Sequence, residues 1–211
     1  MDYMKKYEYW LNSEAVDEKD KEELRNLAGN EKEIEDRFFK DLSFGTGGIR
    51  GVRGIGTNRI NKYVIRKATQ GLANYMLGFD EKLAKEKGII IAHDCRIGSR
   101  EYALNTARVM AANGIKAYIY EDLRSTPELS FGVRYKGTMA GIVVTASHNP
   151  VEYNGYKVYW DDGAQVVDPH APAIVAEVNK IQTLEEIKVI SEAEGREKGL
   201  IIQLDGKIDD D

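Results

Sequence analysis

Residues 141–157, GIVVTASHNPVEYNGYK, carry the clearest indication of the fold. The β-branched run Ile142–Val144 follows a glycine and predicts a short buried strand. A polar cluster follows at once and places Ser147 just past the carboxyl end of that strand, where open α/β sheets hold their ligands. Pro150 disfavours helical geometry at the residue before it, and the Asn154-Gly155 dipeptide predicts a turn that folds the chain back. The stretch therefore predicts an α/β domain with a ligand loop at a strand end.

Three side chains of this stretch suit the transfer of a phosphoryl group. Ser147 offers an acceptor oxygen, His148 carries protons near neutral pH, and Lys157, brought back by the turn, adds a fixed positive charge. Structural interpretations stay open: His148 can be a loop histidine that orients the serine, and Lys157 a plain lysine at a strand edge. A serine hydrolase is disfavoured, because Ser147 does not lie in Gly-x-Ser-x-Gly and Pro150 would obstruct the turn of that motif.

The segments around the loop predict strands and helices in alternation. Strands are expected near Ile49 and at 88–93, 115–120 and 140–144, with helices in 1–40 and at 58–78, 99–113 and 125–135. The order strand, helix, strand at this spacing predicts parallel strands with a right-handed crossover. After the loop we expect a hairpin (156–160 with 164–167), a helix after Pro169, a helical 183–199, and a last strand or the start of a link at 201–204.

Composition and charge limit the class of protein. A chain of 211 residues with 42% hydrophobic residues can fold as one fairly large domain with a real core. The net charge of −5 disfavours nucleic acid as a partner, so a phosphate site has to be positive only locally. The one cysteine, Cys95, excludes an internal disulfide and fits a reducing cytoplasm. We find no secretory signal and no apolar run that could span a bilayer, so we expect a cytoplasmic protein without a membrane partner.

A second stretch, Ser43–Gly56, holds six glycines besides Arg50 and one further arginine. Glycine lets the backbone approach an anion closely and point its N–H groups at it. A glycine-rich loop that merely leads into a strand would look the same, so the glycines alone do not decide. Arg50 adds a permanently charged planar fork that matches phosphate oxygens, which makes it a candidate active-site arginine.

Four motifs resemble those of the α-D-phosphohexomutases, the phosphoglucomutase and phosphomannomutase family. Thr145–Pro150 is similar to the family's Thr-x-Ser-His-Asn-Pro loop, Phe44–Gly51 to its arginine motif, Asn154–Lys157 to its Asn-Gly-x-Lys segment, and Asp94–Arg96 to its Asp-x-Arg segment. The resemblance covers essentially the whole chain and is closest to the longer bacterial phospho-sugar mutases. It implies a three-layer α/β/α fold with a mixed, mostly parallel sheet like the family's first domain, preceded by a helical arm.

The resemblance also implies roles for the matched residues. Ser147 would carry the phosphate in the working enzyme and would join a magnesium site through that phosphate. Catalytic roles fall to Ser147, His148, Lys157 and Arg50, and contacts with substrate or phosphate to Arg50, Lys157, His148 and Asn149. Supporting positions at the border of the cleft fall to Asp94 and Arg96, although a surface arginine on an ordinary strand-to-helix loop is an equal alternative for that segment.

The reaction that the resemblance implies moves a phosphate between the 1- and 6-positions of a hexose. Phosphorylated Ser147 would give its phosphoryl group to a hexose monophosphate, and the resulting hexose 1,6-bisphosphate would return its other phosphate to the serine. Mg²⁺ would offset charge on the moving group. We favour glucose and leave mannose open. The alternatives are a mutase for an amino sugar phosphate and a non-catalytic module that binds phosphosugars.

The domain organisation follows from the same resemblance. We expect a helical arm at 1–43, a first phosphohexomutase domain with the phosphoserine loop at 44–204, and at 205–211 the start of a linker. The family's enzymes have four domains, so the chain looks like the first alone, with domains two to four of the same polypeptide as its partners. The family's Asp-Gly-Asp-x-Asp-Arg metal loop is not in this sequence. We therefore expect the isolated chain to fold but to be nearly inactive.

Overall fold

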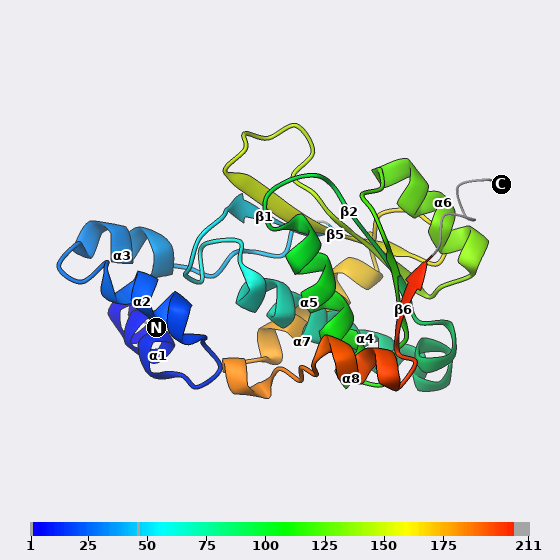
Figure 1. Ribbon diagram of the computed structural model, residues 1–211, viewed down its shortest axis with the longest axis horizontal. Helices are drawn as coiled ribbons and strands as arrows, with labels where there is room; N and C mark the ends of the chain where they lie inside the picture. Colours follow the sequence, from blue (N-terminus) through cyan, green and yellow to red (C-terminus); the bar gives the residue numbers. More distant parts are fainter. Residues whose placement is uncertain (1, 46, 205–211) are drawn as a thin grey trace.

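The structure, a computed structural model, describes residues 2–45 and 47–204. These residues form a sheet of six strands with helices around it (Figure 1). The strands are β1 (Gly48–Val52), β2 (Ile89–His93), β3 (Ala117–Tyr120), β4 (Ala140–Val144), β5 (Tyr153–Trp160) and β6 (Ile201–Leu204). The helices are α1 (Tyr3–Asn12), α2 (Glu18–Arg25), α3 (Glu31–Phe38), α4 (Lys62–Lys87), α5 (Ser99–Ala112), α6 (Thr126–Lys136), α7 (His170–Lys180) and α8 (Glu192–Glu197), with a 3₁₀ helix, η1, at Leu184–Glu186.

The sheet is mixed and mostly parallel, as predicted. Its strand order is β1-β5-β4-β2-β3-β6. The strands β4, β2, β3 and β6 pair in parallel, and β5 runs antiparallel to both of its neighbours, β1 and β4. The carboxyl ends of the parallel strands therefore meet at one edge of the sheet, which is where an open α/β sheet offers a ligand site.

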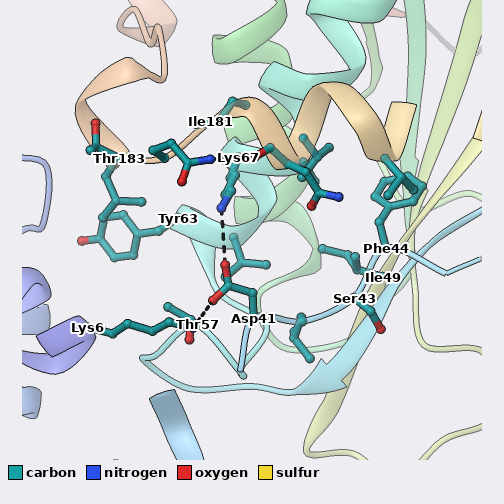
Figure 2. A pocket seen from close by; sticks show the side chains of 18 of the residues that line it. Lys6, Asp41, Ser43, Phe44, Ile49, Thr57, Tyr63, Lys67, Ile181 and Thr183 are labelled. Carbon is teal, nitrogen blue, oxygen red and sulfur yellow. Dashed lines mark hydrogen bonds and ion pairs between the residues drawn. The ribbon is translucent and has the colours of Figure 1, made fainter. Parts of the chain in front are cut away.

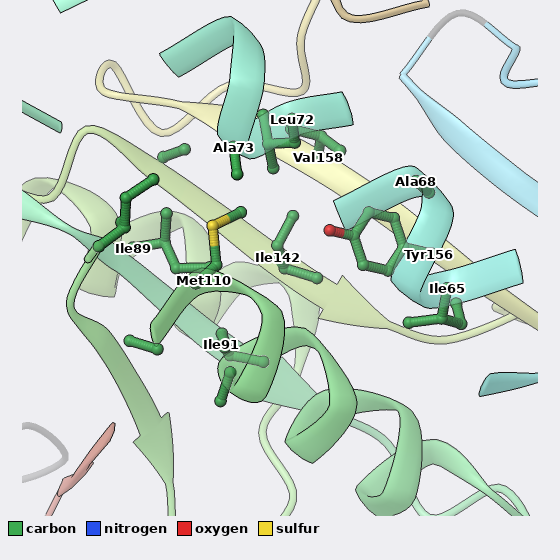
Figure 3. Packing of buried hydrophobic residues seen from close by; sticks show 14 of the residues in the cluster. Ile65, Ala68, Leu72, Ala73, Ile89, Ile91, Met110, Ile142, Tyr156 and Val158 are labelled. Carbon is green, nitrogen blue, oxygen red and sulfur yellow. The ribbon is translucent and has the colours of Figure 1, made fainter. Parts of the chain in front are cut away.

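Helices cover both faces of the sheet, which gives the expected three layers. On one face, α4 and α5 pack against alternate residues of the strands, among them Ile89, Ile91 and Ile142 (Figure 3). Helix α7 packs against α4 and contributes Ile174 to the same core. On the other face, α6 packs against the intervening residues Ile90 and Val143. These strand residues are at most 1% exposed, which explains why β2 and β4 read as continuous apolar runs rather than as alternating ones.

The helical arm has a small core of its own and packs onto the domain. Its cluster includes Trp10 and Phe38 from the arm and Tyr63 from the start of α4. The Trp10 ring lies edge-on to both, with ring centroids 5.7 Å from Phe38 and 5.2 Å from Tyr63. The Tyr63 hydroxyl also accepts a hydrogen bond from the Asp17 backbone N–H at 2.8 Å. In Figure 1 the arm lies at one end of the molecule, and β6 lies toward the other end.

The prediction of a turn at Asn154-Gly155 was wrong, because both residues lie inside β5. The chain turns earlier, where the Tyr153 N–H donates to the Pro150 carbonyl at 3.0 Å. Asn154 is fully buried, and its side-chain amide donates to the Ser99 hydroxyl at 2.9 Å. At Gly155, the backbone of Thr145 and of Ile49 leaves little room for a side chain. Contacts with these segments and with Ser99, and not a turn, therefore explain why asparagine and glycine stand at these two positions.

The predicted hairpin forms its turn but not its second strand. Gly163 has φ +77° at the tip, and Trp160 N–H donates to the Ala164 carbonyl at 3.0 Å. Only an isolated bridge, Tyr159 with Gln165, follows. The reason is that β1 already pairs with residues 153–157 of β5, which leaves a short free edge for the returning segment.

Two helix predictions also needed correction. Residues 183–199 do not form one helix but two short ones, η1 and α8, with an extended segment between them. Two hydrogen bonds hold this segment against the domain: the Lys188 N–H donates to the Gln70 side chain, and the Arg108 side chain donates to the Ile190 carbonyl. Helix α4 runs past Gly78 to Lys87, with a kink at Asp80.

Residues 201–204 form a strand, β6, and not a link. The linker predicted at 205–211 lies outside the described residues.

Candidate active site

The loop that follows β4 presents Ser147 to solvent. Ser147 is exposed, whereas the residues just before it, Thr145 and Ala146, are buried. Its backbone φ is +57°, a left-handed conformation that costs a residue with a side chain about 1–2 kcal/mol. The Ser147 N–H donates to the Thr145 hydroxyl at 2.9 Å, and the Asn149 N–H donates to the Ala146 carbonyl at 3.1 Å. A tight, internally bonded turn thus carries the predicted nucleophile.

His148 lies within reach of the serine hydroxyl. Its Nδ1 is 3.3 Å from Ser147 Oγ, and either atom can be the donor, depending on the tautomer of the ring. Both side chains are exposed. This contact supports either a proton-carrying role for the imidazole or an orienting one, the two alternatives that the sequence left open.

Arg50 reaches the same loop from β1. Its Nη1 donates to Asn149 Oδ1 at 2.7 Å, a contact between residues 99 positions apart in the sequence. Arg50 lies opposite Gly155 in the β1–β5 register, and its side chain is exposed. The structure therefore brings Arg50 to the loop that carries Asn149 and Ser147.

Lys157 lies on β5, on the same face of the sheet as Arg50. It pairs with Val143, whose side chain packs on the α6 face, and cross-strand partners share a face. By the same alternation, Arg50, opposite Gly155, lies on this face too. Arg50 and Lys157 are diagonal neighbours on adjacent strands, about 7–8 Å apart in such a register. Two positive charges thus flank the carboxyl end of β4 on one face.

Asp94 and Arg96 form the support beneath the loop. The Arg96 guanidinium donates to the backbone carbonyls of Ser147 and Asn149, both at 2.7 Å. Its Nε faces Asp94 Oδ2 at 3.3 Å. The segment is therefore part of the site's architecture and not a solvent-facing loop with a free surface arginine.

The sequence did not reveal two further residues of this support. The Ser99 hydroxyl donates to Asp94 Oδ1 at 2.6 Å and accepts from Asn154 Nδ2 at 2.9 Å. Ser99 is the first residue of α5, and Gly98 occupies the N-cap position. No local pattern points to Asn154, because the aromatic residues on either side of it, Tyr153 and Tyr156, are three positions apart and do not alternate as in a strand.

A cavity of about 580 Å³ lies elsewhere, between the arm and the domain (Figure 2). One of its walls includes Ile49, the β1 residue whose side chain lies on the opposite face of the strand from Arg50. Lys6 and Lys67 flank Asp41 there, with Nζ–O distances of 2.7 Å and 3.4 Å. None of the residues predicted for the phosphoryl site lines this cavity, so it is a separate feature.

The geometry defines a class of protein. An exposed serine hydroxyl stands at the carboxyl edge of a mixed sheet, next to an imidazole, with a guanidinium and an ammonium on neighbouring strands. Such a site in an α/β domain is suited to binding an oxyanion such as phosphate, because Arg and Lys supply fixed positive charge. The serine hydroxyl can serve as the acceptor of a phosphoryl group.

The chain belongs to the phosphoglucomutase/phosphomannomutase family. Residues 41–185 match the family described as "Phosphoglucomutase/phosphomannomutase, alpha/beta/alpha domain I". The match includes every residue predicted for the site. It begins at residue 41, near the end of the helical arm.

Comparisons with individual proteins agree with this assignment. The chain is 39% identical over 155 residues to a phosphoglucomutase of Staphylococcus haemolyticus, which covers 74% of this chain and 28% of that protein. It is 40% identical over 152 residues to a human phosphopentomutase, covering 69% of this chain and 25% of that protein. The chain thus spans about a quarter of the length of these curated relatives.

Solved structures show the same fold. A putative phosphomannomutase from Thermus thermophilus superposes with a TM-score of 0.63 at 24% identity, covering 79% of this chain and 34% of the other. A phosphoglucomutase from Paramecium, in an open form, gives 0.57 at 22% identity, covering 74% and 28%. At this level of identity the likeness establishes the architecture of the domain and nothing about its ligand.

Proposed function

We propose that this chain is the phosphoserine-bearing first domain of a sugar-phosphate mutase, with Ser147 as the residue that carries the phosphoryl group. The observation that carries the proposal is the exposed Ser147 hydroxyl, 3.3 Å from His148 Nδ1. On the same loop, Asn149 accepts a hydrogen bond from Arg50 at 2.7 Å. The family assignment supports this role for the loop.

In the proposed reaction the bond between phosphorus and Ser147 Oγ breaks as a sugar hydroxyl forms a new bond to phosphorus. A sugar bisphosphate results, and its other phosphate then returns to the serine. The hydroxyl gives up its proton to His148 or Lys157. Arg50 stabilises the negative charge on the moving group, and Lys157 does so as an ammonium where His148 takes the proton; this is the main contribution that a protein makes to phosphoryl transfer.

The substrate that we propose is a hexose monophosphate, with glucose favoured and the 1,6-bisphosphate as activator. A pentose phosphate is a second candidate, because the human phosphopentomutase is as similar to this chain as the staphylococcal phosphoglucomutase is. Assays of the complete polypeptide with glucose 1-phosphate and with ribose 1-phosphate, each with a trace of its bisphosphate, separate the two.

The described residues do not by themselves form a magnesium site. No group of three or more His, Cys, Asp or Glu side chains is suitably placed among residues 2–45 and 47–204. The nearby Asp94 carboxylate is already engaged by Ser99, Arg96 and the Arg96 backbone N–H. Among residues 2–45 and 47–204, a metal ion would therefore meet only a phosphate on Ser147, and we propose that its carboxylate ligands come from outside these residues.

We further propose that the chain works together with domains two to four and is nearly inactive alone. The chain spans only about a quarter of the length of its relatives, which supports this proposal.

Among the helices that the structure describes, none combines the length and the apolar character that crossing a membrane requires.

The decisive experiment follows labelled phosphate. A polypeptide that carries this chain followed by domains two to four is mixed with labelled glucose 1,6-bisphosphate, and the site of labelling is found by peptide mapping. We expect label on Ser147, none in Ser147→Ala, and normal labelling in the control Ser191→Ala, which removes a hydroxyl that caps α8. Sugar-phosphate binding without label transfer would favour the non-catalytic module.

A separate measurement assigns the proton carrier. We expect one of the variants His148→Gln and Lys157→Gln to abolish a limb of the pH–rate profile. The other variant should mainly raise the substrate concentration that gives half the maximal rate. Loss of neither limb would exclude both residues from proton transfer.

A further inference from the structure

Arg96 differs from Arg50 in that its hydrogen-bonding capacity is fully used within the protein. A guanidinium has five N–H donors. Four Arg96 donors meet loop carbonyls and the fifth, on Nε, faces Asp94. The four carbonyls, with their distances from the guanidinium nitrogens, belong to Ser147 (2.7 Å), Asn149 (2.7 Å), Pro150 (2.9 Å) and Tyr153 (3.3 Å). No donor of Arg96 is left for a phosphate oxygen.

We propose that Arg96 is the positioning residue of the nucleophile loop: it holds Ser147 in the orientation needed for phosphoryl transfer and does not bind the phosphate itself. The part of this proposal that concerns the reaction rate rests on the proposed function. Arg50 has the complementary role, because the structure gives its guanidinium a single bond, to Asn149, and the side chain is exposed.

The conformation of Ser147 explains why such a residue is needed. A left-handed conformation is unfavourable for a serine, and it persists only where the surrounding structure determines it. Two short hydrogen bonds from Arg96 hold the carbonyls of Ser147 and Asn149, on both sides of His148. Charge-assisted hydrogen bonds are about twice as strong as neutral ones, so together they can offset that cost.

Arg96 is itself held from below. Asp94 Oδ1 accepts from the Arg96 backbone N–H at 3.0 Å and from the Ser99 hydroxyl at 2.6 Å. Ser99 in turn accepts from the buried amide of Asn154 on β5 at 2.9 Å. A chain of hydrogen bonds thus runs from β5 through the first turn of α5 to the loop. The Asp94 charge also neutralises Arg96, so the cation beneath the loop does not compete with Arg50 for phosphate.

The first test measures the loop itself and needs no activity. Hydrogen exchange of the amides of 145–153 is compared in the full chain, in Arg96→Ala, in Arg96→Lys and in Arg100→Ala, an exposed arginine on the same helix-loop segment. We expect exchange in the loop to be about tenfold faster in Arg96→Ala, partly restored by lysine, and unchanged in Arg100→Ala. Protection of β2 and β4 has to be unchanged, which shows that the variants are folded.

The second test measures phosphorylation of Ser147 in the polypeptide with all domains. For Arg96→Ala we expect the rate at saturating glucose 1,6-bisphosphate to fall about 100-fold, with a half-saturating concentration that stays within about threefold of the wild-type value. Arg50→Ala should instead raise the half-saturating concentration. Arg96→Lys should recover part of the rate.

Two results would overturn the proposal. One is an Arg96→Ala loop that exchanges as slowly as in the wild type; the other is a loss of affinity for the bisphosphate as large as that in Arg50→Ala. If the loop is loosened in Arg96→Ala while the wild-type polypeptide takes up no label on Ser147, the positioning role stands and the proposed function fails.

Discussion

Gly155 offers a sharp test of how tightly the strands behind the loop are packed. A Cβ added there would lie 2.6 Å from the Thr145 carbonyl oxygen and 3.0 Å from that of Ile49. Both atoms are backbone of flanking segments, so no side-chain rotation can relieve the contact. Gly155 does not have a positive φ, and alanine would therefore fit its backbone conformation. The effect of Gly155→Ala depends on space alone.

The size of the effect follows from the shift that is required. The Thr145 oxygen has to move from 2.6 Å to the 3.4 Å at which ordinary contact begins. Overpacking of this kind costs about 1–3 kcal/mol. For a domain of this size that corresponds to a fall in Tm of about 2–12 °C. Because Thr145 begins the loop that carries Ser147, we also expect slower phosphorylation of the serine.

The control is the same substitution at Gly78, in α4. A Cβ there meets no atom within 4 Å, and the position is helical, so alanine should stabilise the chain by about 0.5–1 kcal/mol. Urea denaturation followed by circular dichroism gives both free energies of unfolding. If Gly155→Ala were as stable as the wild type, the strand packing described for β5 would be wrong.

Two further predictions concern stability. Burial raises the pKa of Asp41, but the hydrogen bond from Lys6 and the charge of Lys67 outweigh it, so the pKa lies below its ordinary value of 3.8. Because the pKa of Asp41 is lower in the folded than in the unfolded chain, the ionised carboxylate stabilises the fold above the unfolded pKa, and this stability is lost as the pH falls through the folded pKa. The free energy of unfolding from urea titration should therefore be lower in Asp41→Asn than in the wild type by about 1 kcal/mol or less at pH 7, and the difference should vanish in acid. Ser125→Ala should cost about 1 kcal/mol in urea unfolding, because it breaks the capping box with Glu128; an unchanged midpoint would contradict that role.

Local signals explain which elements were predicted correctly. Asn61 accepts from the N–H groups of Tyr63 and Val64, and Ser125 caps α6, as their positions before amphipathic runs indicate. The apolar runs of β2 and β4 were recognisable because they are buried on both faces. By contrast, Asn154-Gly155 has the composition of a turn, and nothing nearby in the sequence indicates that Thr145 and Ser99 surround it.

The candidate site was predictable to the extent that its residues are grouped in motifs. Ser147, His148 and Asn149 are neighbours in sequence, so their proximity needed no structure. The contact of Arg50 with Asn149 and the four carbonyls gathered by Arg96 join segments about 50 to 100 positions apart. The functional roles of all these residues stay predictions until they are tested.

The order of the amino acids was enough to predict the alternation of strands and helices, the position of the serine after a buried strand and the family to which the loop is similar. Those properties depend on periodicity and on short motifs, which act over a few residues. Contacts between distant segments were needed to establish that β5 includes Asn154 and Gly155, and that all five N–H donors of Arg96 face the loop or Asp94. The physical reason is that a hydrogen bond or a steric contact between distant segments depends on how the whole sheet packs.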